Sequence, residues 1–225
     1  GTFIINGTER VVVTQLVRSP GAYIMEPKDP AKQVFTANLM PQRGSWLELE
    51  IDKKGQVFAR IDRKRKLPVT TLLRALPEAD AVTGEAIDTH SDEGIRNLFR
   101  DPETGEPNLF IDLTLEKDPA KTHDQALIEV FKKQRPGEPP TTANAKALLK
   151  RLFFDPKRYD LGRVGRYKVN QKLGLKTDSR ILTKDDLVQA TKYLLKLKKG
   201  EGSLDDIDHL GSRRIRTVGE LLANQ

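Results

Sequence analysis

Residues 45–62, SWLELEIDKKGQVFARID, decide the fold class of this chain. Apolar and acidic residues alternate strictly from Leu47 to Asp52, which is the period of a strand with one buried face. The KKG segment at positions 53–55 then leads into a second β-rich run at positions 56–62. The stretch therefore predicts a β-hairpin that packs one face on a core.

Further strands are expected on the N-terminal side of this hairpin. The runs TFII (2–5) and TERVVVTQLV (8–17) flank Asn6-Gly7, the strongest short signal for a hairpin turn. RSPGAY (18–23) breaks the pattern and predicts a loop, and QVFTANLM (33–40) predicts another strand.

Helices dominate from Pro68 onward. Apolar residues at helical spacing predict helices that start at Pro68, at about position 124 (to 134) and at about position 142 (to 154). Another helix should begin at Thr183, with Asp186 at the capping-box distance. Residues 158–174 predict a basic helix or turn interrupted by Gly162 and Gly165, and residues 78–122 predict a poorly specified insertion with short helical pieces near 95–99. Strands followed by helices, in blocks, predict an α+β fold.

Composition limits the possible functions. The 225 residues are 37% hydrophobic and 32% charged, with a net charge of +7 and no cysteine. The absence of cysteine excludes disulfides and thiolate metal sites, and no apolar run is long enough to span a membrane, so a cytoplasmic location is expected. The positive charge favours a polyanionic partner, and both ends of the chain predict a piece of a larger protein.

The first candidate site is the run RIDRKRKLP, whose five cations are Arg60, Arg63, Lys64, Arg65 and Lys66. A charged edge that blocks strand-to-strand aggregation is one interpretation. Contact with nucleic-acid phosphates is the other, because cations ahead of a helix N-terminus gain nothing from the helix dipole.

Trp46, the only tryptophan, is the second candidate. It shares parity with Glu48 and Glu50, so its side chain should point away from the core. Packing under a loop and stacking on an unpaired base both remain open as its role.

Catalytic signals are weak. His90, His123 and His209 lack metal-ligand spacing, and no nucleophile is paired with a base. Asp205, Asp206 and Asp208 precede the arginines at 213, 214 and 216, which favours a salt-bridged turn over a metal site. The apolar residues from Ile215 onward predict a terminal helix.

Several long blocks resemble the β subunit of bacterial DNA-directed RNA polymerase, in the order of that family. They are GTFIINGTERVVVTQLVRSPG, RGSW, RIDRKRKLP, QRPGEPPT, FFDPKRYDLGRVGRYKVNQKLG and DDIDHLGSRRIRTVGEL. The resemblance implies a lobe domain at residues 19–205, which carries the variable insertion. It also implies protrusion strips at residues 1–18 and 206–225.

The resemblance also implies site residues. A pocket for a flipped-out guanine of the non-template strand would use Arg18, Trp46, Ile207, Asp208 and Arg213, with Asp208 on the base edge and Trp46 as a stacking platform. The path of that strand would run along Asp62, Arg63, Lys64 and Arg65. Part of a rifamycin pocket would come from Arg10, Val13 and Gln15.

In this family the subunit belongs to a nucleotidyltransferase that copies DNA into RNA. The resemblance implies no catalytic residue, metal or cofactor in this segment, because the catalytic Mg²⁺ is expected on β′. Implied partners are DNA, β′, α, ω, a sigma factor and regulators that dock on the lobe or protrusion, with nucleoid association and no membrane. The alternatives are a docking module for a transcription regulator or coupling factor, and a free-standing basic nucleic-acid-binding protein.

Overall fold

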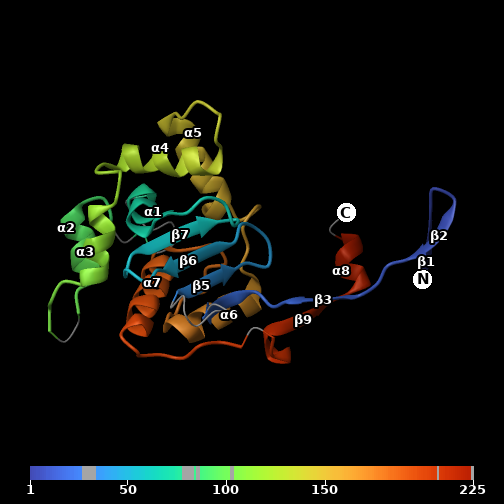
Figure 1. Ribbon diagram of the computed structural model, residues 1–225. Coiled ribbons are helices and arrows are strands. Elements are labelled where there is room, and N and C mark those ends of the chain that lie inside the picture. Colours follow the sequence, from blue (N-terminus) through green and yellow to red (C-terminus); the bar gives the residue numbers. More distant parts are fainter. Residues whose placement is uncertain (27–33, 78–83, 85–86, 102–103, 207, 224–225) are drawn as a thin grey trace. The chain divides into compact units, whose positions relative to one another are not determined.

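The computed structural model describes residues 1–26, 34–77, 84, 87–101, 104–206 and 208–223 (Figure 1). The chain forms two compact units. Unit 1 combines Gly1–Ser19 with Asp206–Gln225, and unit 2 is Pro20–Asp205. The assignment of these segments to a lobe and a protrusion stays a prediction.

Unit 2 is built on a five-stranded antiparallel sheet in the order β4-β5-β6-β7-β8. The strands are β4 (Gly21–Met25), β5 (Phe35–Met40), β6 (Leu47–Ile51), β7 (Val57–Ile61) and β8 (Leu67–Pro68). The predicted hairpin is confirmed as β6 and β7, in which Leu49 lies opposite Ala59. Every second residue of both strands is buried, so the alternation in the sequence places one face of the sheet on the core.

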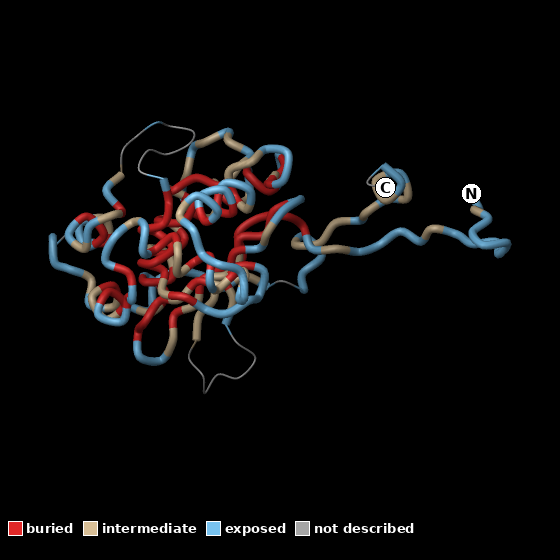
Figure 2. The backbone as a smooth tube through the Cα atoms, turned by 90° about the horizontal axis from the view of Figure 1, so that it is seen from above, coloured by how far each residue is buried: buried red, intermediate tan, exposed pale blue. Residues whose placement is uncertain are grey.

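Seven α-helices follow the sheet within the described part of unit 2. They are α1 (Val69–Ala75), α2 (Asp92–Leu98), α3 (Leu109–Glu116), α4 (His123–Gln134), α5 (Thr142–Leu149), α6 (Gly162–Leu173) and α7 (Lys184–Lys198). Helix α7 packs on β5 and β6, α6 packs on β4, and α1 contacts both β7 and α4. Apart from Ser19, the buried residues that the structure describes all lie in unit 2 (Figure 2). The α+β fold is therefore confirmed.

Two local predictions in unit 2 are wrong. Residues 21–23 of the loop predicted at 18–23 belong instead to the strand β4, because the residues from Gly21 onward join the sheet edge beside β5. Residues 162–173 form one continuous helix, α6, which Gly165 does not interrupt, whereas Gly162, with φ of 70°, lies where the helix begins. Gly165 is explained by close packing, since a Cβ added there would lie 2.9 Å from Pro20 Cβ.

The helix boundaries agree with the sequence pattern elsewhere, with two additions. The helix predicted for 142–154 is α-helical as far as Leu149 and continues as a π-helical turn over Lys150–Phe154. Within the predicted insertion, α2 covers the expected helical piece, whereas α3 was not predicted. The capping box at Thr183 and Asp186 is confirmed.

A buried ion network ties this insertion to the rest of unit 2. The Arg74 side chain is fully buried and pairs with Asp92 at 2.5 Å and with Asp118 at 3.8 Å. Partial burial raises the pKa of Asp92, but the hydrogen bonds and charges of Arg74 and Lys121 outweigh it and hold that pKa below its usual value. One guanidinium therefore joins α1 to the start of α2 and to the segment after α3.

A second buried pair joins α6 to α7. Arg166 binds both carboxylate oxygens of Asp186, at 2.6 and 2.9 Å, and donates to the backbone carbonyls of Ser179 and Ile181. Asp186 also accepts from the Thr183 backbone at the start of α7. The capping residue predicted from the sequence thus also neutralises a buried arginine.

Unit 1 has two small antiparallel pairs of strands. They are β1 (Thr2–Ile5) with β2 (Thr8–Val11), and β3 (Gln15–Arg18) with β9 (Arg213–Arg216). Asn6 and Gly7 form the predicted turn, with φ of 51° and 75°. A 3-10 turn spans Leu210–Ser212, and the terminal helix α8 covers Val218–Ala223. Ile215 is therefore in a strand and not in the predicted helix, because the ladder with β3 extends to Arg216.

Candidate nucleic-acid interface

The Trp46 side chain lies outside the core, as its parity in the sequence predicts. It is 38% exposed, whereas Leu47 beside it is fully buried. The guanidinium carbon of Arg63 lies 5.1 Å from the centre of the Trp46 ring. A cation over an exposed indole stabilises by about 0.5–1 kcal/mol, so this contact gives the ring a preferred position.

A tight turn that follows β7 holds the backbone of Trp46 in place. The Asp62 backbone N–H donates to the Trp46 carbonyl at 2.9 Å, and Asp62 Oδ1 accepts from the Trp46 N–H at 2.8 Å. The Lys64 N–H closes the turn on the Ile61 carbonyl at 3.1 Å. The backbone of Trp46 is therefore fixed on both its polar groups by one residue.

This turn contains two consecutive residues in the left-handed region. Asp62 has φ of 52° and Arg63 has φ of 58°, a pair that matches a type I′ turn. Such a conformation costs non-glycine residues about 1–3 kcal/mol each, although aspartate tolerates it better than most. The strained turn brings Arg63 over the indole.

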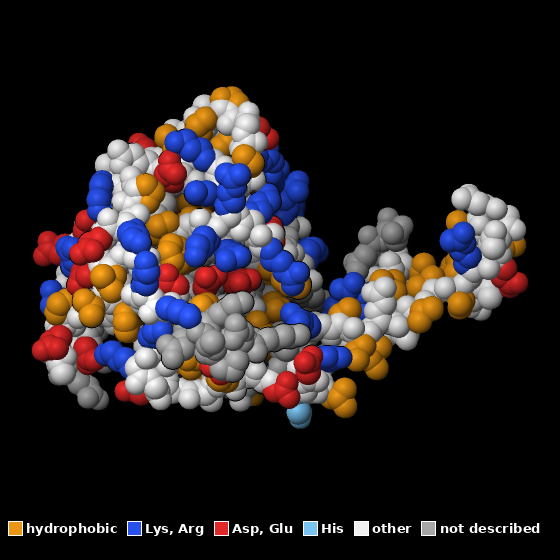
Figure 3. Space-filling model, in the orientation of Figure 1, with side chains coloured by type: hydrophobic (Ala, Val, Ile, Leu, Met, Phe, Trp, Pro, Cys, Tyr) orange, Lys and Arg blue, Asp and Glu red, His pale blue; other side chains and the backbone are white. Residues whose placement is uncertain are grey.

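The five cations of the RIDRKRKLP run differ in the partners that they contact. Arg60 pairs with Glu50 at 2.9 Å, and Lys66 lies 3.7 Å from the same carboxylate. Lys64 Nζ donates to the Gln134 carbonyl at 2.9 Å. Arg63 and Arg65 make no ion pair with any described residue, so they are the cations of this run most available to a phosphate. Figure 3 shows lysine and arginine side chains spread over the visible face of unit 2, with acidic side chains among them.

Unit 1 brings three of the predicted pocket residues together. Arg18 in β3 lies directly opposite Arg213 in β9. Like charges in this position repel, and Arg213 is partly neutralised by Asp208 Oδ1 at 2.7 Å. Asp208 keeps a side-chain exposure of 78%. Trp46 belongs to unit 2, and Ile207 lies outside the described residues, so the five-residue pocket stays a prediction.

The acidic turn predicted at 205–208 is confirmed only in part. Asp208 pairs with Arg213, but Asp205 instead accepts from Lys172 Nζ and from the Ile24 N–H, both at 2.8 Å. Arg214 pairs with Glu220 through both carboxylate oxygens at 2.7 Å. This hydrogen bond from Arg214 holds the pKa of Glu220 below its usual value. An arginine ahead of α8 thus has a structural partner in the first turn of that helix.

The residues predicted for the rifamycin pocket all lie in unit 1. Arg10 is in β2 opposite Phe3, Gln15 is in β3 opposite Arg216, and Val13 is 67% exposed between the two strands. All three side chains are exposed. Their role in drug binding stays a prediction.

The described residues contain no group of three or more histidines, cysteines and acids that could hold a metal ion. His90 and His123 do come together, with ring centres 4.4 Å apart, which their sequence positions did not predict. One ring nitrogen of His90 lies at hydrogen-bond distance from the Leu76 carbonyl, and one of His123 lies at that distance from the Arg74 carbonyl. Both therefore have structural partners.

Across the described chain, none of the helices is long and apolar enough to cross a membrane.

Comparison with known proteins identifies the family. The family model described as RNA polymerase Rpb2, domain 2, matches residues 18–216. The chain belongs to this family. This assignment and the relatives confirm the resemblance to bacterial RNA polymerase β subunits.

The relatives found in curated proteins are named DNA-directed RNA polymerase subunit beta. The one from Rubrobacter xylanophilus is 51% identical over 99% of this chain, and the one from Syntrophomonas wolfei is 52% identical over 100%. A third, from a Nocardioides species, is 50% identical over 100% of the chain. The chain spans about a fifth of the length of these relatives, which is 20% of the first and 19% of the other two.

Proposed function

We propose that this chain serves transcription as part of an RNA polymerase β subunit, where it holds and guides DNA near the downstream edge of the cleft. The observation that carries this proposal is the outward Trp46 ring, which Asp62 fixes by its backbone and Arg63 covers. An aromatic face beside unpaired guanidinium groups suits a splayed nucleic-acid strand. Stacking supplies about 1–3 kcal/mol per base, and each cation releases counterions from a phosphate.

The proposed pocket receives a guanine of the non-template strand. Asp208 accepts from the Watson–Crick edge of the base, Trp46 stacks on the base below it, and Arg18, Ile207 and Arg213 complete the surroundings. The strand then follows the Asp62 turn. Family membership and the exposed carboxylate of Asp208 support this arrangement.

In this proposal the wider enzyme is a nucleotidyltransferase, and its catalytic Mg²⁺ is bound by β′. The partners are DNA, β′, α, ω and a sigma factor, and the location is the cytoplasm, in association with the nucleoid. Arg10, Val13 and Gln15 contribute only the N-terminal part of a rifamycin site. The names of the relatives support membership of a DNA-directed RNA polymerase.

The decisive experiment separates hydrogen bonding from stacking in an assembled polymerase that contains variant β subunits. Templates that differ only at the proposed non-template position are compared by open-complex lifetime. Asp208→Ala should lose the preference for guanine, because the donors of the base edge are left unpaired at about 1–3 kcal/mol. Trp46→Ala should weaken the holding of every base, whereas Trp46→Phe should retain part of it.

Full guanine preference in Asp208→Ala would show that the pocket assignment is wrong. Lys53→Ala is a matched control, since Lys53 is exposed at the opposite end of the β6–β7 hairpin. This variant should leave both the lifetimes and the base preference unchanged.

A further inference from the structure

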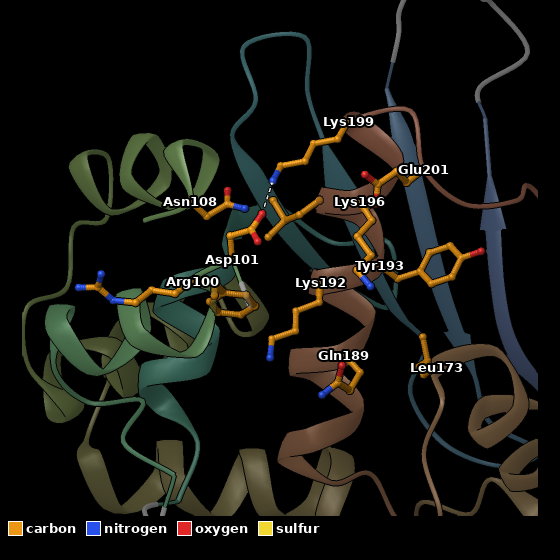
Figure 4. A pocket seen from close by; sticks show the side chains of 12 residues that line it. Arg100, Asp101, Asn108, Leu173, Gln189, Lys192, Tyr193, Lys196, Lys199 and Glu201 are labelled. Carbon is orange, nitrogen blue, oxygen red and sulfur yellow. Dashed lines mark hydrogen bonds and ion pairs between the residues drawn. The ribbon is translucent and has the colours of Figure 1, made fainter. Parts of the chain in front are cut away.

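A cleft on unit 2 has a lining that shares no residue with the Trp46 turn. It has a volume of about 450 Å³ and is lined by α7, by the segment that follows α2, and by residues 173 and 201 (Figure 4). Its apolar wall includes Phe99 and Leu195, which are each 3% exposed. Clefts of roughly 300–1,000 Å³ are the size that small-molecule ligands occupy.

Lysines line one side of this cleft at helical spacing. Lys192, Lys196 and Lys199 recur at intervals of four and three residues along α7 and its C-terminal end, so they share one face. Lys199 reaches across the cleft to Asp101 at 3.1 Å (Figure 4). In the part of the chain that the structure describes, Lys192 and Lys196 form no ion pair.

The helix itself explains only part of this arrangement. Cations in the last turn gain from the helix dipole, which accounts for Lys196. Lys192 lies one turn earlier, and like charges four residues apart repel by about 0.2–0.5 kcal/mol. Arg100 adds a fourth cation, and its guanidinium donates to Asn97 and to the Gly105 carbonyl. Against these four cations the lining supplies two acids, Asp101 and Glu201.

We propose that this cleft binds a small polyanion that carries two or more linked phosphate groups. Lys192 and Lys196 would contact the phosphates directly, as point charges on flexible stems. The Asp101 carboxylate would compete with the ligand for Lys199. The ion pair between Asp101 and Lys199 therefore partly blocks the anion site. The apolar wall leaves room for an organic group next to the phosphates.

Calorimetric titration of the chain with inorganic tripolyphosphate tests the proposal. The double variant Lys192→Gln, Lys196→Gln should raise the dissociation constant about tenfold or more, since two charged contacts are lost. Asp101→Asn should lower it several-fold, because Lys199 is released. A merely structural Asp101 would not give this gain in affinity.

The matched control is Lys146→Gln with Lys150→Gln. These lysines are exposed, four residues apart, and outside the cleft lining, so the net charge changes equally. The control should bind as the parent chain does. Thermal unfolding of every variant checks that the fold is retained.

Two further ligands distinguish the source of the phosphates. ATP that binds more tightly than tripolyphosphate supports a nucleotide whose organic part uses the apolar wall, and equal affinities support recognition of the phosphates alone. Tighter binding of an acidic peptide would overturn the proposal in favour of a protein partner. No binding of tripolyphosphate at millimolar concentration, or equal binding by the double variant and its control, would overturn it as well.

Discussion

Both units of this chain contain antiparallel strands rich in apolar residues, but only unit 2 buries them. In β6 of unit 2, Leu47, Leu49 and Ile51 are fully buried. In β1 of unit 1, Ile4 is 81% exposed and Ile5 is 48% exposed. Ser19 is the only buried residue among those described in unit 1. The same local pattern thus leads to different packing, because helices cover one face of the sheet in unit 2.

The two units are therefore stabilised by different interactions. Unit 2 gains from apolar burial, at about 25 cal/mol per Å² of surface removed from water, and from ion pairs that are shielded from solvent. Unit 1 depends on strand ladders and on partly exposed pairs such as Arg214 with Glu220. Exposed ion pairs contribute about 0–1 kcal/mol. Substitutions of the same chemical type should consequently have unequal effects in the two units.

The largest contrast should come from removing one arginine in each unit. Arg74→Ala should lower the free energy of unfolding by about 3–5 kcal/mol, because Asp118 is left buried without its cation. Arg214→Ala should lower it by about 1 kcal/mol or less, since its pair with Glu220 is partly solvated. Urea denaturation measures both. Equal losses would mean that the exposure of the pair does not set its contribution.

Truncation of an apolar side chain should give the next contrast. Leu49→Ala removes a fully buried side chain and should cost about 2–5 kcal/mol, partly through the cavity that remains. Ile4→Ala removes a mostly exposed side chain and should change the free energy of unfolding by less than about 0.5 kcal/mol. A large loss from Ile4→Ala in the same denaturation assay would reveal a hydrophobic contact within unit 1 that the structure does not show.

A third comparison concerns the two ends of the β6–β7 hairpin. Arg63→Ala with Arg65→Ala should weaken binding of the chain to DNA oligonucleotides with little sequence preference. The slope of log K against log salt should fall by up to about 2, or roughly one unit per lost phosphate contact. Fluorescence anisotropy over a salt series measures this slope. Lys53→Ala with Lys54→Ala removes equal charge at the other end and should leave the slope unchanged.

An unchanged slope in the arginine variant would contradict a role in DNA contact. These side chains would then only keep a strand edge soluble, which is the other interpretation that the sequence leaves open. Arg63 and Arg65, unlike Arg60 and Lys66, have no carboxylate partner among the described residues, which is the reason that phosphate contact is proposed for them.

Features with a local cause were predictable from the sequence. The alternation from Leu47 to Asp52 correctly predicted a half-buried strand and an outward Trp46, because the period of two is a property of the strand itself. Asn6-Gly7 predicted its turn for a similar reason, since both residues tolerate positive φ. The capping box at Thr183 was likewise a short-range signal.

Features that depend on distant partners were not predictable. Strand β4 was missed because Pro20-Gly21 is typical of turns, whereas pairing with β5 decides its structure. The tilted contact between His90 and His123 depends on how the insertion packs against the start of α4. The turn at Asp62 and Arg63 lacks the glycine that usually marks positive φ, so its strained geometry left no clear signal in the sequence.

The smallest contrast between a variant and its control, and the most specific one, should come from this turn. Asp62→Ala removes the acceptor for the Trp46 N–H and puts alanine at positive φ, which together should cost about 1–2 kcal/mol. Asp62→Asn is the matched control, because its side-chain oxygen still accepts and asparagine tolerates the left-handed region. Trp46 is the only tryptophan, so its emission reports on this site alone.

In Asp62→Ala, the emission should shift to longer wavelength and become more sensitive to quenching, because the indole loses its fixed place under Arg63. In Asp62→Asn it should stay as in the parent chain. An unchanged spectrum in Asp62→Ala would mean that strand β6 alone positions the ring. In an assembled polymerase, Asp62→Ala should shorten open-complex lifetime for every non-template base and leave the preference for guanine intact. Asp62 positions Trp46 and the turn in unit 2, whereas the hydrogen-bonding partner proposed for guanine is Asp208 in unit 1.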